Sequence, residues 1–233
     1  EAFQGRYGRH FPRPQPMQRK PITPPRLLGV LGKMDLGTSI GPEGWRVAEL
    51  KKLPQELLAR LCTLLERIEE EGKWPEASMG LVAPLPKGGG LGAGDVRPIT
   101  VMSVLYRAWA ALRVQELIPW QEGWLDEAIC SYRPERGCED IWLPQAISVE
   151  YALLFNQPLA GFNADLAKAF DRVPIEILLL LAEAIGMDAN IVRALKGVHK
   201  QLQRRWKLGP FVGDVFKSTN GILQGCPLSV ILL

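Results

Sequence analysis

Helical patterns and short apolar runs follow one another irregularly along this chain of 233 residues, and this order constrains the fold most. The clearest helical pattern covers residues 53–72. Six apolar side chains there recur at a spacing that places them on one face of a helix: Leu57, Leu58, Leu61, Leu64, Leu65 and Ile68. Pro54 suits the first turn of this helix, and Gly72 suits its C-terminal cap.

Strands are expected where apolar runs are short. Single strands are predicted over residues 81–85, 96–101 and 159–165. A strand hairpin that turns at Gly209-Pro210 is predicted over residues 205–217. Further helices are predicted over residues 103–118, 140–155, 174–185 and 189–202, the first of them capped by Ser103. Because these elements do not follow the regular βαβ order, the sequence predicts an α+β fold.

Composition excludes several classes of protein. Apolar residues make up 47% of the chain and charged residues 23%, which is ordinary for a globular protein. No apolar run reaches the length of about 18 residues that a membrane span needs. The four cysteines form no CxxC pair, and only two histidines are present, so zinc ribbons, dithiol redox motifs, Ser-His-Asp triads and HExxH sites are not expected. The chain begins with Glu1 and ends within an apolar run, which suggests a piece of a longer reading frame.

The first 26 residues differ in composition from the rest. They contain six prolines and six basic side chains against Glu1, a net charge of +5. Such a segment has little apolar surface to bury, and we expect a flexible, partly extended arm. Two interpretations stay open, namely contact with nucleic-acid phosphates and a solvated linker.

The glycine-rich segment 88–94 fits neither the GxGxxG pattern of dinucleotide sites nor the P-loop pattern. A mobile hairpin tip is one interpretation. However, Lys87 and Arg97 flank the segment, one on each predicted strand. Two cations on adjacent strands predict a clamp for a triphosphate.

Two further segments contain candidate site residues. The predicted strand 159–165 ends at Asp165, and a carboxylate at a strand end suits a hard divalent cation. Asp171 is interpreted as the N-cap of the helix that Pro174 would open. Gln224-Gly225-Cys226-Pro227 places an amide side chain on a tight turn, where the backbone can approach a ligand closely or serve structure alone.

Taken in order, these blocks resemble the reverse transcriptases of non-LTR (LINE-type) retrotransposons. Residues 41–45 resemble the upstream GPDG motif, and residues 85–87 with 95–99 resemble the fingers strands. Residues 132–138 resemble the next block. Residues 165–171 match the first palm motif, DxxKAFD, and residues 224–229 match the motif that follows.

The resemblance implies a right-hand polymerase fold. After the basic arm of residues 1–26, it implies a fingers-like region over 27–158 and the start of the palm over 159–233. The implied reaction is RNA- or DNA-templated addition of deoxynucleotides to a primer 3′ end, with two Mg²⁺ ions, or Mn²⁺, assisting phosphoryl transfer. The implied partners are therefore template RNA, primer DNA and deoxynucleoside triphosphates, with no membrane.

The resemblance also assigns roles to individual residues. Asp165 and the carbonyl of Leu166 would bind metal, and Lys87 with Arg97 would bind the incoming triphosphate. Gln224 and Gly225 would shape the nucleotide pocket. Phe170, five residues after Asp165, would lie beneath the sugar and exclude a 2′-hydroxyl.

Two departures from the family pattern affect these expectations. Glu43 stands where the GPDG motif has Asp, and its extra methylene is expected to loosen a local turn. The second metal-binding motif of the palm does not occur in the 233 residues, so we expect no activity from this chain alone. Two alternatives remain open: a degenerate, non-catalytic remnant that binds nucleic acid, and an unrelated helical interaction domain.

Overall fold

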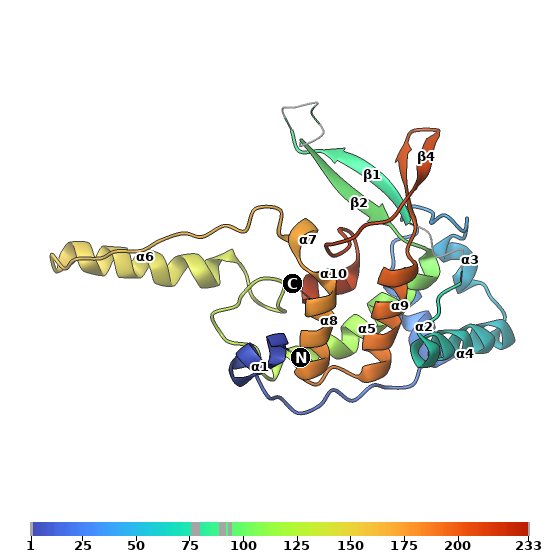
Figure 1. Cartoon of the computed structure of the whole chain (residues 1–233), viewed down its shortest axis with the longest axis horizontal. Helices are drawn as coiled ribbons and strands as arrows, with labels where there is room; N and C mark the ends of the chain where they lie inside the picture. Colours follow the sequence, from blue (N-terminus) through green and yellow to red (C-terminus); the bar gives the residue numbers. More distant parts are fainter. Residues whose placement is uncertain (1, 76–79, 89–91, 93–94, 233) are drawn as a thin grey trace.

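The computed structural model describes residues 2–75, 80–88, 92 and 95–232. A body of helices carries two strand hairpins on one side, and a long helix with its return loop extends from another side (Figure 1). The helices of the described residues are α1 (Ala2–Tyr7), the 3₁₀ helix η1 (Gly8–His10), α2 (Pro24–Lys33), α3 (Val47–Lys51), α4 (Gln55–Glu71), α5 (Val104–Glu122), α6 (Cys138–Leu154), α7 (Ala169–Arg172), α8 (Ile175–Ala184), α9 (Ala189–Gln201) and α10 (Pro227–Leu232). None of them is both long and apolar enough to cross a bilayer.

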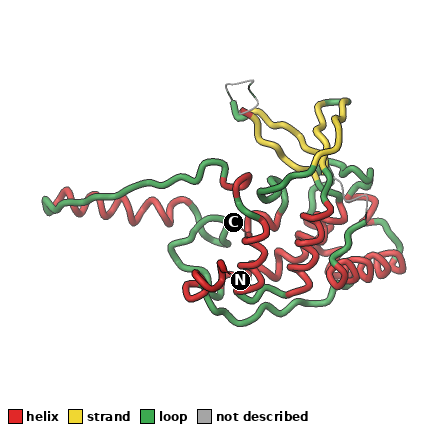
Figure 2. Tube along the Cα trace, viewed as in Figure 1, coloured by secondary structure: helices red, strands yellow, loops and turns green. Residues whose placement is uncertain are grey.

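The strands form one mixed sheet in the order β2-β1-β3-β4, seen as two diverging hairpins in Figure 2. β1 (Gly80–Pro86) and β2 (Val96–Val101) pair antiparallel from Leu81 opposite Val101 to Pro86 opposite Val96. β3 (Arg204–Leu208) pairs antiparallel with β4 (Phe211–Phe216) and parallel with the start of β1. The predicted strands 81–85 and 96–101 and the predicted hairpin are thus confirmed, within a fold that mixes helices with a sheet.

Local signals define the ends of the two central helices. Gly72 ends α4 in the left-handed conformation, at φ 68°, which glycine adopts without strain. Ser103 caps α5 by accepting a hydrogen bond from the Tyr106 amide. Glu43 adds to this cap, because its carboxylate accepts a hydrogen bond from the Val104 amide. The turn that contains Glu43 keeps its backbone hydrogen bond from Gly44 to Gly41, at 3.1 Å.

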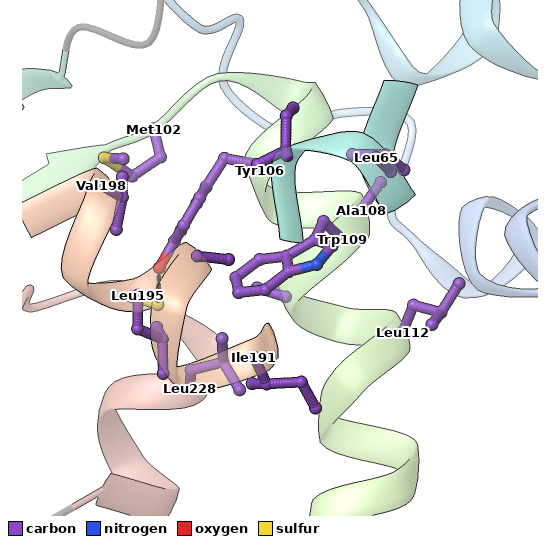
Figure 3. Packing of buried hydrophobic residues seen from close by; sticks show 14 of the residues in the cluster. Leu65, Met102, Tyr106, Ala108, Trp109, Leu112, Ile191, Leu195, Val198 and Leu228 are labelled. Atoms are coloured by element: carbon purple, nitrogen blue, oxygen red, sulfur yellow. Dashed lines mark hydrogen bonds between the residues drawn. The ribbon is translucent and has the colours of Figure 1, made fainter. Parts of the chain in front are cut away.

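The hydrophobic core is built around α5. Its side chains pack against α4, α9 and α10, as Figure 3 shows for Leu65, Trp109, Ile191, Leu195 and Leu228, among others. The Tyr106 hydroxyl lies 3.0 Å from the Cys226 sulfur in this core. The buried face of α4 is narrower than predicted, since Leu57 and Leu64 are 46% and 39% exposed.

The N-terminal segment differs from its predicted flexible state. Residues 15–26, here called the N-terminal strap, lie across the helical body as coil up to residue 23 and then form the first residues of α2. Met17 and Ile22 are buried in the core, and the Met17 amide donates to the Gly186 carbonyl at 2.8 Å. Arg19 forms an ion pair of 2.7 Å with Glu69.

A buried charge cluster explains why a basic, proline-rich segment packs. Glu69 and Arg113 are fully buried and paired at 2.6 Å, and Glu116 pairs with Arg113 at 2.9 Å. Arg19 and Arg26 of the strap pair with these two carboxylates. Buried carboxylates need such partners, so the cations of the strap form ion pairs inside the fold and do not remain in solvent. Composition alone cannot reveal partners that lie so far along the chain.

The predicted strand over residues 159–165 is wrong. These residues form an exposed coil that returns beside α6, and Phe162 is 95% exposed (Figure 1). A strand needs a neighbour for its backbone groups, and no described strand pairs with this segment. The apolar helix α6 is also exposed, with no buried residue.

Candidate functional site

The β1–β2 hairpin positions the two predicted cations. Arg97 lies on β2 opposite Leu85, and Lys87 directly follows β1. The Lys87 amide donates to the Asp95 carbonyl at 2.7 Å, which closes the ladder beyond the last strand pair. The glycine-rich tip predicted here lies mostly outside the described residues, at 89–91 and 93–94.

The short helix α7 contains Phe170 and is held by the segment that precedes the Gln-Gly turn. The Ile222 amide donates to the Phe170 carbonyl at 2.7 Å, and the Gly221 amide donates to the Val173 carbonyl at 3.0 Å. Gly221 has φ 86°, and a Cβ there would lie 2.8 Å from the Phe170 carbonyl oxygen. Glycine is required at this position, and its close approach joins two motifs that lie about 50 residues apart.

Asp171 is not a helix cap, contrary to the sequence interpretation. It lies within α7, and Pro174 is the N-cap of α8. The Asp171 carboxylate instead accepts a hydrogen bond of 3.0 Å from the side-chain amide of Gln224. The last residue of DxxKAFD and the first residue of the Gln-Gly turn are therefore in direct contact.

Gly225 lets the turn approach strand β2. It has φ 99°, and a Cβ there would lie 3.0 Å from the Ile99 side chain and 3.2 Å from the Thr100 carbonyl oxygen. The neighbouring Gln224 carbonyl accepts from the Thr100 amide at 2.8 Å. The backbone thus fixes Gln224 against the strand that carries Arg97.

Two neighbouring hollows gather five of the seven predicted site residues. The smaller, of about 210 Å³, is lined by Lys87, Arg97 and Gln224, together with Val96, Pro98, Lys168, Asp171 and Trp206. The larger, of about 620 Å³, is lined by Arg97, Phe170, Gln224 and Gly225, together with Ile99, Tyr132, Cys226, Pro227 and Val230. Arg97 and Gln224 border both hollows.

The sequence interpretation missed Lys168 as a site residue. Its side chain brings a third cation to the smaller hollow, against the single carboxylate of Asp171. Lys168 has a left-handed backbone at φ 56°, which non-glycine residues rarely adopt, and its carbonyl accepts from the Asp171 amide at 3.0 Å. Its presence in DxxKAFD was a usable signal, but its conformation was not predictable from one sequence. Three cations around one hollow are suited to binding a polyphosphate.

The remaining two predicted site residues lie outside these hollows. Asp165 and Leu166 are exposed in the coil that precedes α7, and Leu166 is 80% exposed. Within the described part of the chain, no group of three or more His, Cys, Asp or Glu side chains is arranged to hold a metal ion.

Comparison with known protein families identifies the relationship that these motifs indicated. The family described as reverse transcriptase (RNA-dependent DNA polymerase) matches residues 85–233, which is more than half of the chain. The matched region includes Lys87, Arg97, Lys168, Asp171 and Gln224, the polar residues of the smaller hollow. The chain therefore belongs to the reverse transcriptase family.

Proposed function

We propose that this chain is the fingers and first part of the palm of a non-LTR (LINE-type) reverse transcriptase, with fingers over residues 27–158 and palm over 159–233. Its function would be template-directed addition of deoxynucleotides to a primer 3′ end. One observation carries this proposal: Lys87, Arg97 and Lys168 surround one hollow beside the Gln224–Asp171 contact. The order of the motifs, from residue 41 to residue 229, supports the non-LTR assignment.

In this proposal the hollows divide the work of binding a deoxynucleoside triphosphate. Lys87 and Arg97 neutralise the phosphates, and Lys168 adds a third positive charge. Gln224 and Gly225 shape the adjoining hollow for the base and sugar, with Phe170 on its wall. A ring at this position would collide with a ribose 2′-hydroxyl and would thereby favour deoxynucleotides.

The described residues do not by themselves fit a two-metal centre. Asp165 is exposed and outside the hollows, and Asp171, the carboxylate that lines the smaller hollow, accepts a hydrogen bond from Gln224. Divalent cations such as Mg²⁺ require several oxygen ligands. Asp165 and the Leu166 carbonyl are proposed as metal ligands on the family resemblance alone. Because these residues lie outside the hollows, we expect no primer extension from this chain alone.

Nucleotide binding tests the proposal without requiring catalysis. Equilibrium dialysis with labelled dTTP, in EDTA and again with Mg²⁺, should show that Lys87→Ala and Arg97→Ala each weaken binding about tenfold to hundredfold, because charge-assisted hydrogen bonds are lost. Lys52→Ala is a matched control, since this lysine is exposed and does not line either hollow. Equal effects from all three variants would contradict the assignment.

The same measurement decides about the non-catalytic alternative. The exposure of Asp165, away from the hollows, favours a degenerate, non-catalytic remnant that binds nucleic acid. If the chain retains labelled RNA on a filter but binds dTTP no better than the Lys87→Ala variant does, that alternative replaces the polymerase. Primer extension that vanishes in Asp165→Ala would instead show a complete catalytic centre.

A further inference from the structure

We propose that the β3–β4 hairpin binds a single-stranded polynucleotide. One base of the polynucleotide would stack on the ring of Trp206, beside the nucleotide hollows. That this strand is the template rests on the proposed function. Binding of the strand is nevertheless measurable without any polymerisation.

The outer half of the hairpin is exposed on both faces. β1 pairs with β3 only from Arg204 to Trp206, and beyond this point the two strands of the hairpin pair only with each other among the described residues. The hairpin projects from the helical body beside the β1–β2 hairpin (Figures 1 and 2). Near its tip, Leu208 and Phe211 are 67% and 75% exposed. A two-stranded ribbon with exposed apolar side chains is a surface suited to a partner.

Aromatic stacking holds the indole of Trp206 in place. Its ring stacks on Phe216, with centroids 5.8 Å apart and planes inclined by 20°. The guanidinium of Arg204 lies 5.4 Å from the centroid of the same Phe216 ring. Trp206 is nevertheless 42% exposed. A fixed, exposed aromatic ring is the platform that proteins use to stack bases of single-stranded nucleic acid, whereas bases inside a duplex are already stacked.

The charge of the hairpin favours a polyanion over an apolar partner. Residues 204–217 carry four cations, Arg204, Arg205, Lys207 and Lys217, against the single anion Asp214. Of these cations, Lys207 and Lys217 are exposed. Cations beside an aromatic platform match the alternation of phosphate and base along a polynucleotide.

Trp206 also connects the hairpin to the candidate nucleotide site. It borders the hollow that contains Lys87, Arg97 and Gln224. It also borders a second hollow of about 220 Å³, on whose wall lie Arg204, Phe216 and Asn220. A base stacked on Trp206 would therefore be adjacent to the incoming nucleotide, where a template base must lie.

Fluorescence anisotropy of the whole chain with labelled 12-mers tests the proposal. Oligo(dT) and oligo(rU) serve as single strands, and a blunt duplex of equal length serves as the comparison. Trp206→Leu should weaken single-strand binding about 5- to 100-fold, the range for losing one base–aromatic stack. Trp206→Phe, which keeps a ring, should recover most of this loss, and duplex binding should change little.

The control is Trp45→Leu, because Trp45 has nearly the same exposure, 46%, and lines neither of the two hollows that Trp206 borders. Lys207→Gln should lower the salt dependence of binding by about one counterion, whereas the exposed Lys52→Gln should not. Unchanged binding in both Trp206→Leu and Lys207→Gln, or equal losses in Trp45→Leu, would overturn the proposal.

Light scattering separates nucleic-acid binding from self-association. The mass of the chain should be the same with and without Phe211→Ser. A dimer that this substitution dissociates while single-strand binding persists would assign the hairpin to a second copy and overturn the proposal. Single-strand binding that depends on Trp206, without dTTP binding, would sustain it and remove the proposed polymerase function. Binding of dTTP without single-strand binding that depends on Trp206 would overturn the hairpin assignment and leave the proposed polymerase function in place.

Discussion

Single residues differ in how far their environment can be read from the sequence. Ser103 and Gly72 were predicted as helix caps, because the signal is local and each residue acts within one turn of its own helix. His199 gives no such signal. In the fold it lies in α9, on the wall of the hollow that contains Arg204. Burial, and then the charge of Arg204, lower the pKa of His199 to about 4.

This lowered pKa predicts a loss of stability in acid. His199 takes up a proton more readily in the unfolded chain, where the ordinary pKa is 6.5. Its contribution is therefore complete above pH 6.5 and declines as the pH falls toward 4. Between about pH 7 and about pH 4.5 the free energy of unfolding should fall by about 2–3 kcal/mol more in the unmodified chain than in His199→Gln. Urea titrations at both pH values measure this, and equal falls in the two proteins would contradict it.

At the scale of elements, patterns predicted most of the regular structure and failed where a segment depends on distant partners. Residues 96–101 form β2 as predicted, since alternation and apolar runs are local properties. The predictions for the strap and for residues 159–165 were wrong in opposite ways. The strap was predicted to be flexible and is packed, whereas residues 159–165 were predicted to form a strand and are an exposed coil. The strap is ordered by Glu69 and Glu116, which lie far along the chain, and the apolar segment lacks a described neighbour strand.

Removing most of the strap should therefore destabilise the fold. Deletion of residues 1–22 takes away the buried Met17 and Ile22 and the Arg19 partner of Glu69. We expect the free energy of unfolding to fall by about 3–5 kcal/mol, the usual result of leaving a buried charge with fewer partners. Deletion of residues 1–13 alone should change it by less than about 0.5 kcal/mol. Chemical denaturation compares the two, and equal stability would show that the strap does not hold the fold.

Over the whole molecule, the helices meet at distances that a single sequence does not reveal. α4 and α9 approach so closely at Gly197 that a Cβ there would lie 1.9 Å from the Gly72 carbonyl oxygen. A Cβ on Gly29, in α2, would instead meet no atom of a neighbouring element within 4 Å. The gathering of Lys87, Arg97 and Gln224 depends on the same long-range packing, and motif order predicted it only through the family resemblance.

The two glycines should respond in opposite ways to alanine. Gly197→Ala forces the two helices apart and should lower the free energy of unfolding by about 3 kcal/mol, the upper end of the usual range for overpacked cores. Gly29→Ala should raise it by about 0.5–1 kcal/mol, because alanine loses less backbone entropy in a helix. Thermal melts read both changes. A neutral Gly197→Ala would mean that α4 and α9 can separate without penalty.

The strap also sets an order of events while the chain is being made. Its residues are synthesised well before their partner, because the Met17 amide binds the Gly186 carbonyl, about 170 residues later in the sequence. At about 5–20 residues per second, the strap waits roughly 10 to 30 s for that partner. Its prolines and positive charge suit a segment that must stay soluble and extended during this interval. The composition that suggested a flexible arm thus suits the nascent chain, and this contact of the strap can form only after the chain has been made through Gly186, which precedes α9.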